Sequence, residues 1–233
     1  MISTAVVARN KLRTDDVFFP AMALLIFVIV VTGFGRTYFL PGMMFAKLPN
    51  GLVHVHGAVF VSWIFLLVAQ TLLVATHNVK WHMKLGVLSL ILIPAMSILG
   101  VLTLFDFIRR AEPDEGPELL LAGDLETLLL FVALTSWALL ARRDSASHKR
   151  LMILGTMAIM GPAIGRWNFP VAVSIAVTGG LPLLVLAYDL WRLRRVHRTT
   201  AVAIALTATW VLTLMPFSKL AFWHQFVGWI RHT

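Results

Sequence analysis

Histidines at the ends of apolar segments are the residues of this sequence best suited to chemistry. His54 and His56 form an H-x-H pair, and His82, His148 and His224 each lie near an end of another apolar run. Neutral imidazole binds haem iron and copper, and it exchanges protons near neutral pH. The chain has no cysteine, which excludes disulfides, Cys-ligated zinc, iron–sulfur clusters and covalently attached c-type haem. A metal or haem must therefore be held by His, Met, Asp, Glu or Tyr.

Two pairs of histidines meet the simplest requirement for bis-His haem b, which is two imidazoles at one depth on different helices. His82 and His148 form one pair, and His56 and His224 form the other. A bundle that stacks two haems repeats its histidine about four helical turns later on the same helix. That position holds Gln70 after His56 and a methionine after His82, so the sequence predicts a single haem at most. The open alternative for His82 and His148 is a pair of headgroup-level histidines beside basic residues that meet anionic lipid.

Copper is a second possible cofactor, at the H-x-H pair. Met43 and Met44 precede His54 and His56, and histidine with methionine is a ligand set suited to copper. Residues two apart on a regular helix diverge by about 200°. Both imidazoles could therefore reach one ion only where the helix is just beginning.

Charged side chains cluster at the same helix ends as His56. Asp124, Glu126, Arg36 and Arg166 all lie at or just inside the ends of apolar segments. Ionisable groups within a membrane are costly, so they usually face the protein interior and pair. Two interpretations stay open: ion pairs that only hold helix ends together, or a water-accessible site in which His56 carries protons.

Apolar helices must position these residues. Hydrophobic residues make up 59% of the 233, charged residues only 13%, and the mean hydropathy is +0.84. One soluble core could not bury so much apolar surface, and lipid can. We therefore expect an all-α integral membrane bundle that forms one domain over residues 1–233. The expected seven spans lie near residues 17–35, 52–76, 85–108, 119–141, 151–165, 171–190 and 201–223.

The distribution of basic residues predicts the orientation. Most of the 20 Lys and Arg residues fall in loops on the N-terminal side of the expected bundle. The positive-inside rule makes that side cytoplasmic and places the C-terminus outside, as in a multi-pass protein of a bacterial inner membrane. This asymmetry explains the net charge of +9 without a nucleic-acid partner. No cleavable signal peptide is expected.

Two patterns relate the spans to one another. His56, Trp63 and Gln70 are spaced seven residues apart, so they share one face of their helix, which should point into the bundle. The segments His82–Gly86 (HMKLG) and His148–Met152 (HKRLM) both follow a basic loop and both open a span. The hairpins made by spans two and three and by spans four and five could therefore be related by duplication.

Several longer motifs resemble segments of other membrane proteins. The segments HVHGAVFVSW, QTLLV, HMKLG, HKRLMILG and PAIGRW, within roughly residues 50–167, resemble an uncharacterised group of bacterial multipass membrane proteins. The resemblance implies that His56, His82, His148 and Arg166 are motif positions. The chain is also distantly similar to His-rich membrane proteins of haem–copper oxidase maturation.

The leading hypothesis is a membrane-embedded protein that holds haem b or copper through histidine, in electron transfer or oxidase-related maturation. One alternative is a small proton- or ion-coupled permease, in which His56, Asp124, Glu126 and Arg166 form the coupling site. Another is a non-catalytic subunit of a larger membrane complex. The expected partners are the lipid bilayer and either a membrane protein or a second copy of the chain; enzymatic activity is left open.

Overall fold

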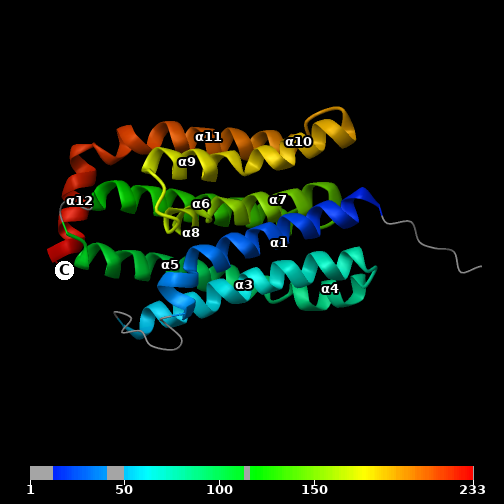
Figure 1. The fold of residues 1–233 in the computed structure, drawn as a ribbon, viewed down its shortest axis with the longest axis horizontal. Coiled ribbons are helices and arrows are strands. Elements are labelled where there is room, and N and C mark those ends of the chain that lie inside the picture. Colours follow the sequence, from blue (N-terminus) through cyan, green and yellow to red (C-terminus); the bar gives the residue numbers. More distant parts are fainter. Residues whose placement is uncertain (1–12, 41–49, 113–115, 233) are drawn as a thin grey trace, which may run out of the picture.

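The computed structural model describes residues 13–40, 50–112 and 116–232, and the described chain is built from helices (Figure 1). Apolar runs with few charges favour helices because a membrane core offers no water to free backbone groups. The helices are α1 (Thr14–Phe34), the π-helix η1 (Gly35–Phe39), α3 (Gly51–Ala75), α4 (Val79–Gly86), α5 (Ser89–Arg110), α6 (Pro117–Leu140), α7 (Ser145–Ala158), α8 (Gly161–Gly165), α9 (Val171–Gly180), α10 (Pro182–Leu193), α11 (Arg198–Ser218) and α12 (Ala221–His232).

The long helices lie side by side as a bundle. Among the described residues, six helical segments are long and apolar enough to cross a membrane, counting α1 with η1, α4 with α5, and α9 with α10 as single segments. The helix α1 begins at one end of the bundle, here named end A, and α12 lies at the other, end B (Figure 1). The chain is therefore a helical bundle of multi-pass membrane type.

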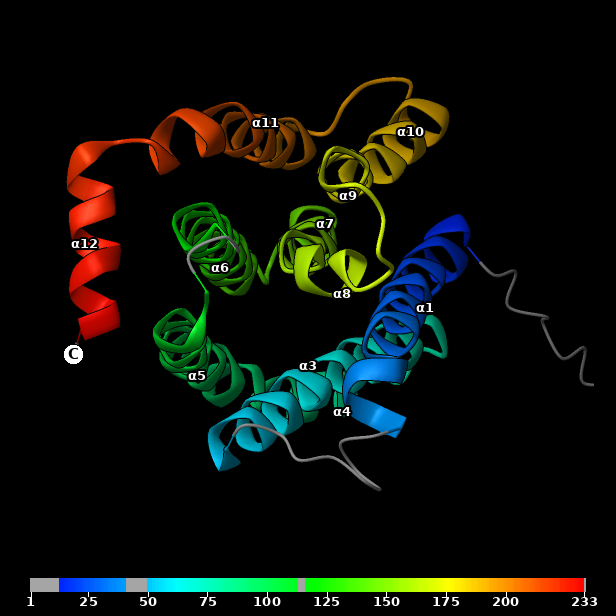
Figure 2. The ribbon, with the colours of Figure 1, turned by 60° about the vertical axis from the view of Figure 1, so that its left-hand side comes forward.

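The segment expected as the fifth span, residues 151–165, is the centre of the bundle. It forms α7 and α8, each shorter than a full span, with α6, α1, α9 and α11 around them (Figure 2). Leu151, Ile153 and Thr156 expose 1% of their surface or less. Protein rather than lipid thus covers this segment, so it needs neither the length nor the outward apolar face of a lipid-exposed helix.

Three expected spans have different boundaries in the structure. The third begins at Val79 instead of residue 85, because α4 continues into α5 through a tight turn, and His82 is thus inside a helix. The sixth is split at Leu181, where Pro182 begins α10. The last ends at Ser218, near Pro216, and the amphipathic helix α12 then turns across the end of the bundle (Figure 2).

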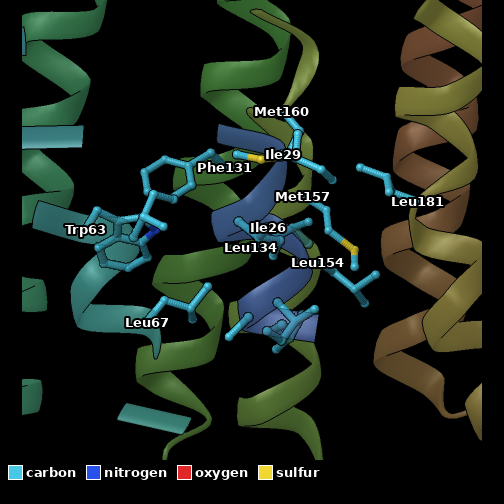
Figure 3. Packing of buried hydrophobic residues seen from close by; sticks show 14 of the residues in the cluster. Ile26, Ile29, Trp63, Leu67, Phe131, Leu134, Leu154, Met157, Met160 and Leu181 are labelled. Carbon is cyan, nitrogen blue, oxygen red and sulfur yellow. The ribbon is translucent and has the colours of Figure 1, made fainter. Parts of the chain in front are cut away.

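Close packing in the bundle centre joins α1, α3, α6, α7 and α8 (Figure 3). The side chains of Ile26, Phe131 and Leu134 are almost fully buried there. Gly33 lets α1 approach α8, since a Cβ at this position would lie 2.8 Å from the carbonyl carbon of Ala163. This core fixes the depth and rotation of the helices that carry the candidate site.

Candidate functional site

An aromatic contact between α3 and α6 marks the middle of the candidate site. Trp63 of α3 meets Phe131 of α6 edge to face, with ring centres 5.3 Å apart (Figure 3). The indole Nε1 of Trp63 donates a hydrogen bond of 3.1 Å to Thr156 Oγ1 of α7. Seven residues of helix rise about 10 Å and return to the same face. One such step in each direction leads to a polar layer near end A and another near end B.

Layer A, near end A, brings together His82 of α4 and His148 of α7. Their ring centres are 6.2 Å apart and their planes are nearly perpendicular, at 85°. Both side chains are half-buried. These two histidines begin the similar segments that open the second span of each hairpin, and the fold brings their rings together edge to face.

His148 is held by its helix and by a backbone carbonyl. Asp144 caps the N-terminus of α7, where its carboxylate accepts hydrogen bonds from the backbone N–H groups of Ala146 and Ser147 and from the Ser147 hydroxyl. The hydrogen bond from the Ser147 side chain lowers the pKa of Asp144, which keeps the cap ionised at neutral pH. His148 Nδ1 lies 2.8 Å from the carbonyl oxygen of Ala138 in α6. A carbonyl only accepts, so Nδ1 carries the proton and Nε2 keeps a free lone pair.

His82 occupies a similar environment in the other hairpin. Its imidazole approaches the backbone carbonyl of Gln70 in α3, and its Nδ1 is buried without a hydrogen-bond partner among the described residues. Both polar atoms of the Gln70 amide are buried and unpaired in the same way. A Cβ at Gly86 would lie 3.3 Å from Gln70 Nε2, so this glycine leaves room for the amide. Layer A thus contains two imidazoles and an amide with unused hydrogen-bonding capacity.

Layer B, near end B, contains His56 of α3. Its ring stacks on Phe60, with ring centres 4.1 Å apart, and approaches the backbone carbonyl of Leu99 in α5. Its Nδ1 is buried and has no partner among the described residues. Asp124 of α6 is one heptad before Phe131, just as His56 is one heptad before Trp63.

Arg166, which follows α8, completes layer B. Its guanidinium interacts electrostatically with both Asp124 and His56. It is anchored by a 2.6 Å hydrogen bond from Nη1 to the Pro162 carbonyl and lies over the ring of Phe34 at 4.3 Å. Arg166 therefore lies within electrostatic range of both His56 and Asp124, which belong to different helices.

The structure separates the other predicted pairs. The regular helix α3 leaves His54 exposed beside Tyr38, while His56 turns inward, so the two imidazoles do not converge on one ion. Met43 and Met44 lie outside the described residues. His224 of α12 is exposed and pairs with Glu118, with 3.1 Å between Nδ1 and Oε1, rather than facing His56.

Two charged residues predicted to pair at end B stand apart from layer B. Arg36 lies exposed in η1. Glu126 is two residues after Asp124, so it points to a different face of α6, where its Oε2 is buried and unpaired among the described residues. Position at a helix end did not determine which way either side chain points.

The strongest ion pairs of the described chain are at end A and were not anticipated. Arg150 donates to Asp189 Oδ1 from Nε at 2.8 Å and from Nη2 at 2.6 Å, and these side chains expose 3% and 0% of their surface. Asp189 also accepts a 2.6 Å hydrogen bond from Thr200 Oγ1. Lys149 and Tyr188 both bond to Asp15. These contacts tie α1, α7, α10 and α11 together directly beside His148.

Comparison with known proteins does not assign this chain to a family. Among the described residues, no three His, Asp or Glu side chains gather as the ligands of a metal ion. No family model, curated protein or solved structure matches the chain.

Proposed function

We propose that this chain is a membrane-embedded haem b protein for electron transfer, in which His82 and His148 would hold the haem. One observation carries the proposal: two imidazoles from different hairpins face each other with ring centres 6.2 Å apart. Two imidazoles this close together, on different helices, could both serve as ligands of one haem iron.

The donor set of layer A fits haem iron. The porphyrin supplies four ligands to the iron, so the protein need supply only two. His148 already presents Nε2, because its Nδ1 proton is used on the Ala138 carbonyl, and metal-bound histidines commonly make such a bond with their other nitrogen. The same two nitrogens could hold a copper ion in place of haem, so the cofactor must be identified directly.

In this proposal the protein itself positions the two histidines and insulates the cofactor that they would hold. When bound, haem supplies a one-electron couple. The Asp144 cap and the Arg150–Asp189 ion pair hold the first turns of α7, and thereby His148, against α6 and α10. Trp63 and Phe131, both buried, lie on the inner side of layer A.

The test is haem content of the purified chain. The wild-type protein from haem-replete cells should show a Soret band and stoichiometric iron, with the pyridine haemochrome spectrum of haem b. His82→Ala and His148→Ala should each lose most of the bound haem, since one axial ligand is removed. His54→Ala and His224→Ala are matched controls, because these histidines lie outside layer A, and both should keep it.

Two results would refute the proposal: folded wild-type protein with neither iron nor a Soret band, or full haem content in both layer A variants. Stoichiometric copper without haem would support the same pair of histidines as the site, with copper as its cofactor. Circular dichroism and size-exclusion chromatography on every variant separate loss of a ligand from loss of the fold.

We further propose that the chain crosses a bacterial inner membrane seven times, with end A cytoplasmic. The α7–α8 segment would be the additional crossing, and the positions of α1 and α12 at opposite ends support an odd number. Electron transfer or oxidase maturation requires a membrane redox partner. That partner, or a second copy of the chain, should co-purify in mild detergent.

A further inference from the structure

We propose that a groove between α3 and the continuous α4–α5 segment holds one acyl chain of an anionic phospholipid, whose phosphate lies against Lys80 and Lys84 at end A. The inference does not depend on the haem proposal, because none of the residues that carry it is assigned to the cofactor. It goes beyond general contact with the bilayer, since it names one class of lipid and one position on the bundle.

The groove is an apolar hollow on the outer surface of the bundle. Its volume is about 330 Å³, at the lower end of the range of ligand pockets, which is about 300–1,000 Å³. Phe65, Leu88 and Ile91 expose 57%, 44% and 64% of their surface, so the groove opens toward lipid rather than toward the bundle centre. The lining residues are Ser62, Phe65, Leu66 and Ala69 of α3 with Leu85, Leu88, Ile91 and Leu92 of the α4–α5 segment.

This lining fits a hydrocarbon chain better than a polar molecule. Ser62 is the one polar side chain among the lining residues, and its hydroxyl already donates a 2.8 Å hydrogen bond to the Ala58 carbonyl. The lining spans seven residues on each helix, which rise about 10 Å, and one leaflet of a bilayer core is roughly 15 Å deep. The groove is therefore long enough for much of one acyl chain.

An aromatic–cation pair lies at the end-A mouth of the groove. Trp81 and Lys84 precede Leu88 by seven and four residues, so they continue the groove-lining face of the α4–α5 segment toward end A. Lys84 Nζ lies 4.9 Å from the centre of the Trp81 ring, and both side chains are exposed. Trp and Lys at the start of a spanning helix are typical of the headgroup level. The groove thus ends at the depth of lipid phosphates.

The positive charge at this mouth has no protein counter-ion. Lys80 and Lys84 lie four residues apart on one side of α4, and neither takes part in an ion pair among the described residues. The sequence has no Asp or Glu between Asp16 and Asp106, so α3 and α4 carry no acid at all. A lipid phosphate supplies the anion, and a lysine ammonium is a common phosphate ligand. Because a zwitterionic headgroup brings its own cation, the two lysines favour an anionic one.

The test measures binding of single lipids to the purified full-length protein by native mass spectrometry. Phosphatidylglycerol should bind more tightly than phosphatidylcholine with the same acyl chains. Lys84→Gln should lower the affinity for phosphatidylglycerol about fivefold and leave that for phosphatidylcholine unchanged, because one basic residue at a membrane surface contributes about this factor. Arg192→Gln is the matched control: this exposed arginine follows the exposed Trp191 at the same end, on α10 and away from the groove. It should leave both affinities unchanged.

A second variant tests the groove itself. Ala69→Phe places a ring in the hollow and should weaken binding of both lipids, whereas Ala205→Phe, at an exposed position of α11, should weaken neither. A phosphatidylglycerol that carries a photoreactive diazirine in its acyl chain should crosslink to residues 62–69 or 85–92. Circular dichroism and size-exclusion chromatography confirm that each variant is folded.

The proposal is overturned if the wild-type protein binds both lipids equally, or if Lys84→Gln and Ala69→Phe both bind phosphatidylglycerol as the wild type does. Crosslinks spread evenly over the helices would reduce the groove to ordinary lipid contact. A dimer that Ala69→Phe dissociates would assign the groove to a second copy of the chain instead, and a co-purified isoprenoid quinone that Ala69→Phe removes would assign it to that molecule.

Discussion

At the residue scale, Asp189 combines full burial with several simultaneous bonds. Its carboxylate receives two N–H groups from Arg150, the Thr200 hydroxyl and the backbone N–H of His197. A buried carboxylate with this many donors is fully compensated, and removing it leaves a guanidinium without its partner in an apolar surrounding. The first turns of α7, and with them His148, depend on this pair.

We therefore predict that Asp189→Ala destabilises the protein by about 3–5 kcal/mol. Asp106→Ala should cost at most about 1 kcal/mol, because its partner Arg110 is 42% exposed. Unfolding in mixed micelles of increasing SDS fraction measures both. A small effect of Asp189→Ala would show that water reaches Arg150 and replaces the lost carboxylate.

Residue identity predicted some of these contacts and missed others. The similar segments at His82 and His148 predicted that the two histidines are equivalent, and the structure brings them together. Asp189 is a lone acid inside an apolar run, a signal for a buried partner that could have been used. Arg36 and Arg166 look alike in the sequence, and only the packing of α8 on α1 turns one of them toward layer B.

At the element scale, the close approach of α1 to α8 depends on Gly33, which has no side chain. A Cβ at Gly33 would lie 2.8 Å from the Ala163 carbonyl carbon and 2.9 Å from its Cα. Both atoms belong to the backbone of the central segment, so the clash cannot be relieved by a rotamer change. The two helices must move apart.

We predict that Gly33→Ala destabilises the bundle by about 1–3 kcal/mol. Gly35→Ala is the matched control: no atom lies within 4 Å of a Cβ at that position, so stability should change by less than about 1 kcal/mol. Thermal unfolding in detergent, followed by circular dichroism, compares the two. Equal stability of both variants would mean that α1 and α8 are not in contact as described.

Element boundaries show what hydropathy can and cannot predict. Hydropathy predicted where the six long apolar helices lie, because lipid exposure demands long apolar runs. It could not predict that α7 and α8 are covered by protein, since an apolar run reads alike whether lipid or protein surrounds it. It also carried the last span to residue 223, past the end of α11 and into the first residues of α12, because the apolar residues of α12 continue the preceding run.

At the scale of the whole molecule, the two ends differ in charge, and this difference should set the orientation. The chain has no cysteine, so a single introduced thiol reports its location without background. In intact spheroplasts, a membrane-impermeant maleimide should label Gln225→Cys of α12 and should label Arg143→Cys only after lysis. The reverse pattern would mean that the orientation is inverted. Labelling of both residues from one side would rule out an odd number of membrane crossings between residues 143 and 225.

The contact of Trp63 with Phe131, together with the hydrogen bond from Trp63 to Thr156, places closely packed side chains between layer A and layer B. Trp63 exposes 2% of its surface and Phe131 and Thr156 expose none. In this arrangement nothing the size of a solute can pass between layer A and layer B unless these side chains move apart. Any passage of matter between the two layers therefore requires a second conformation in which Trp63 no longer bonds to Thr156.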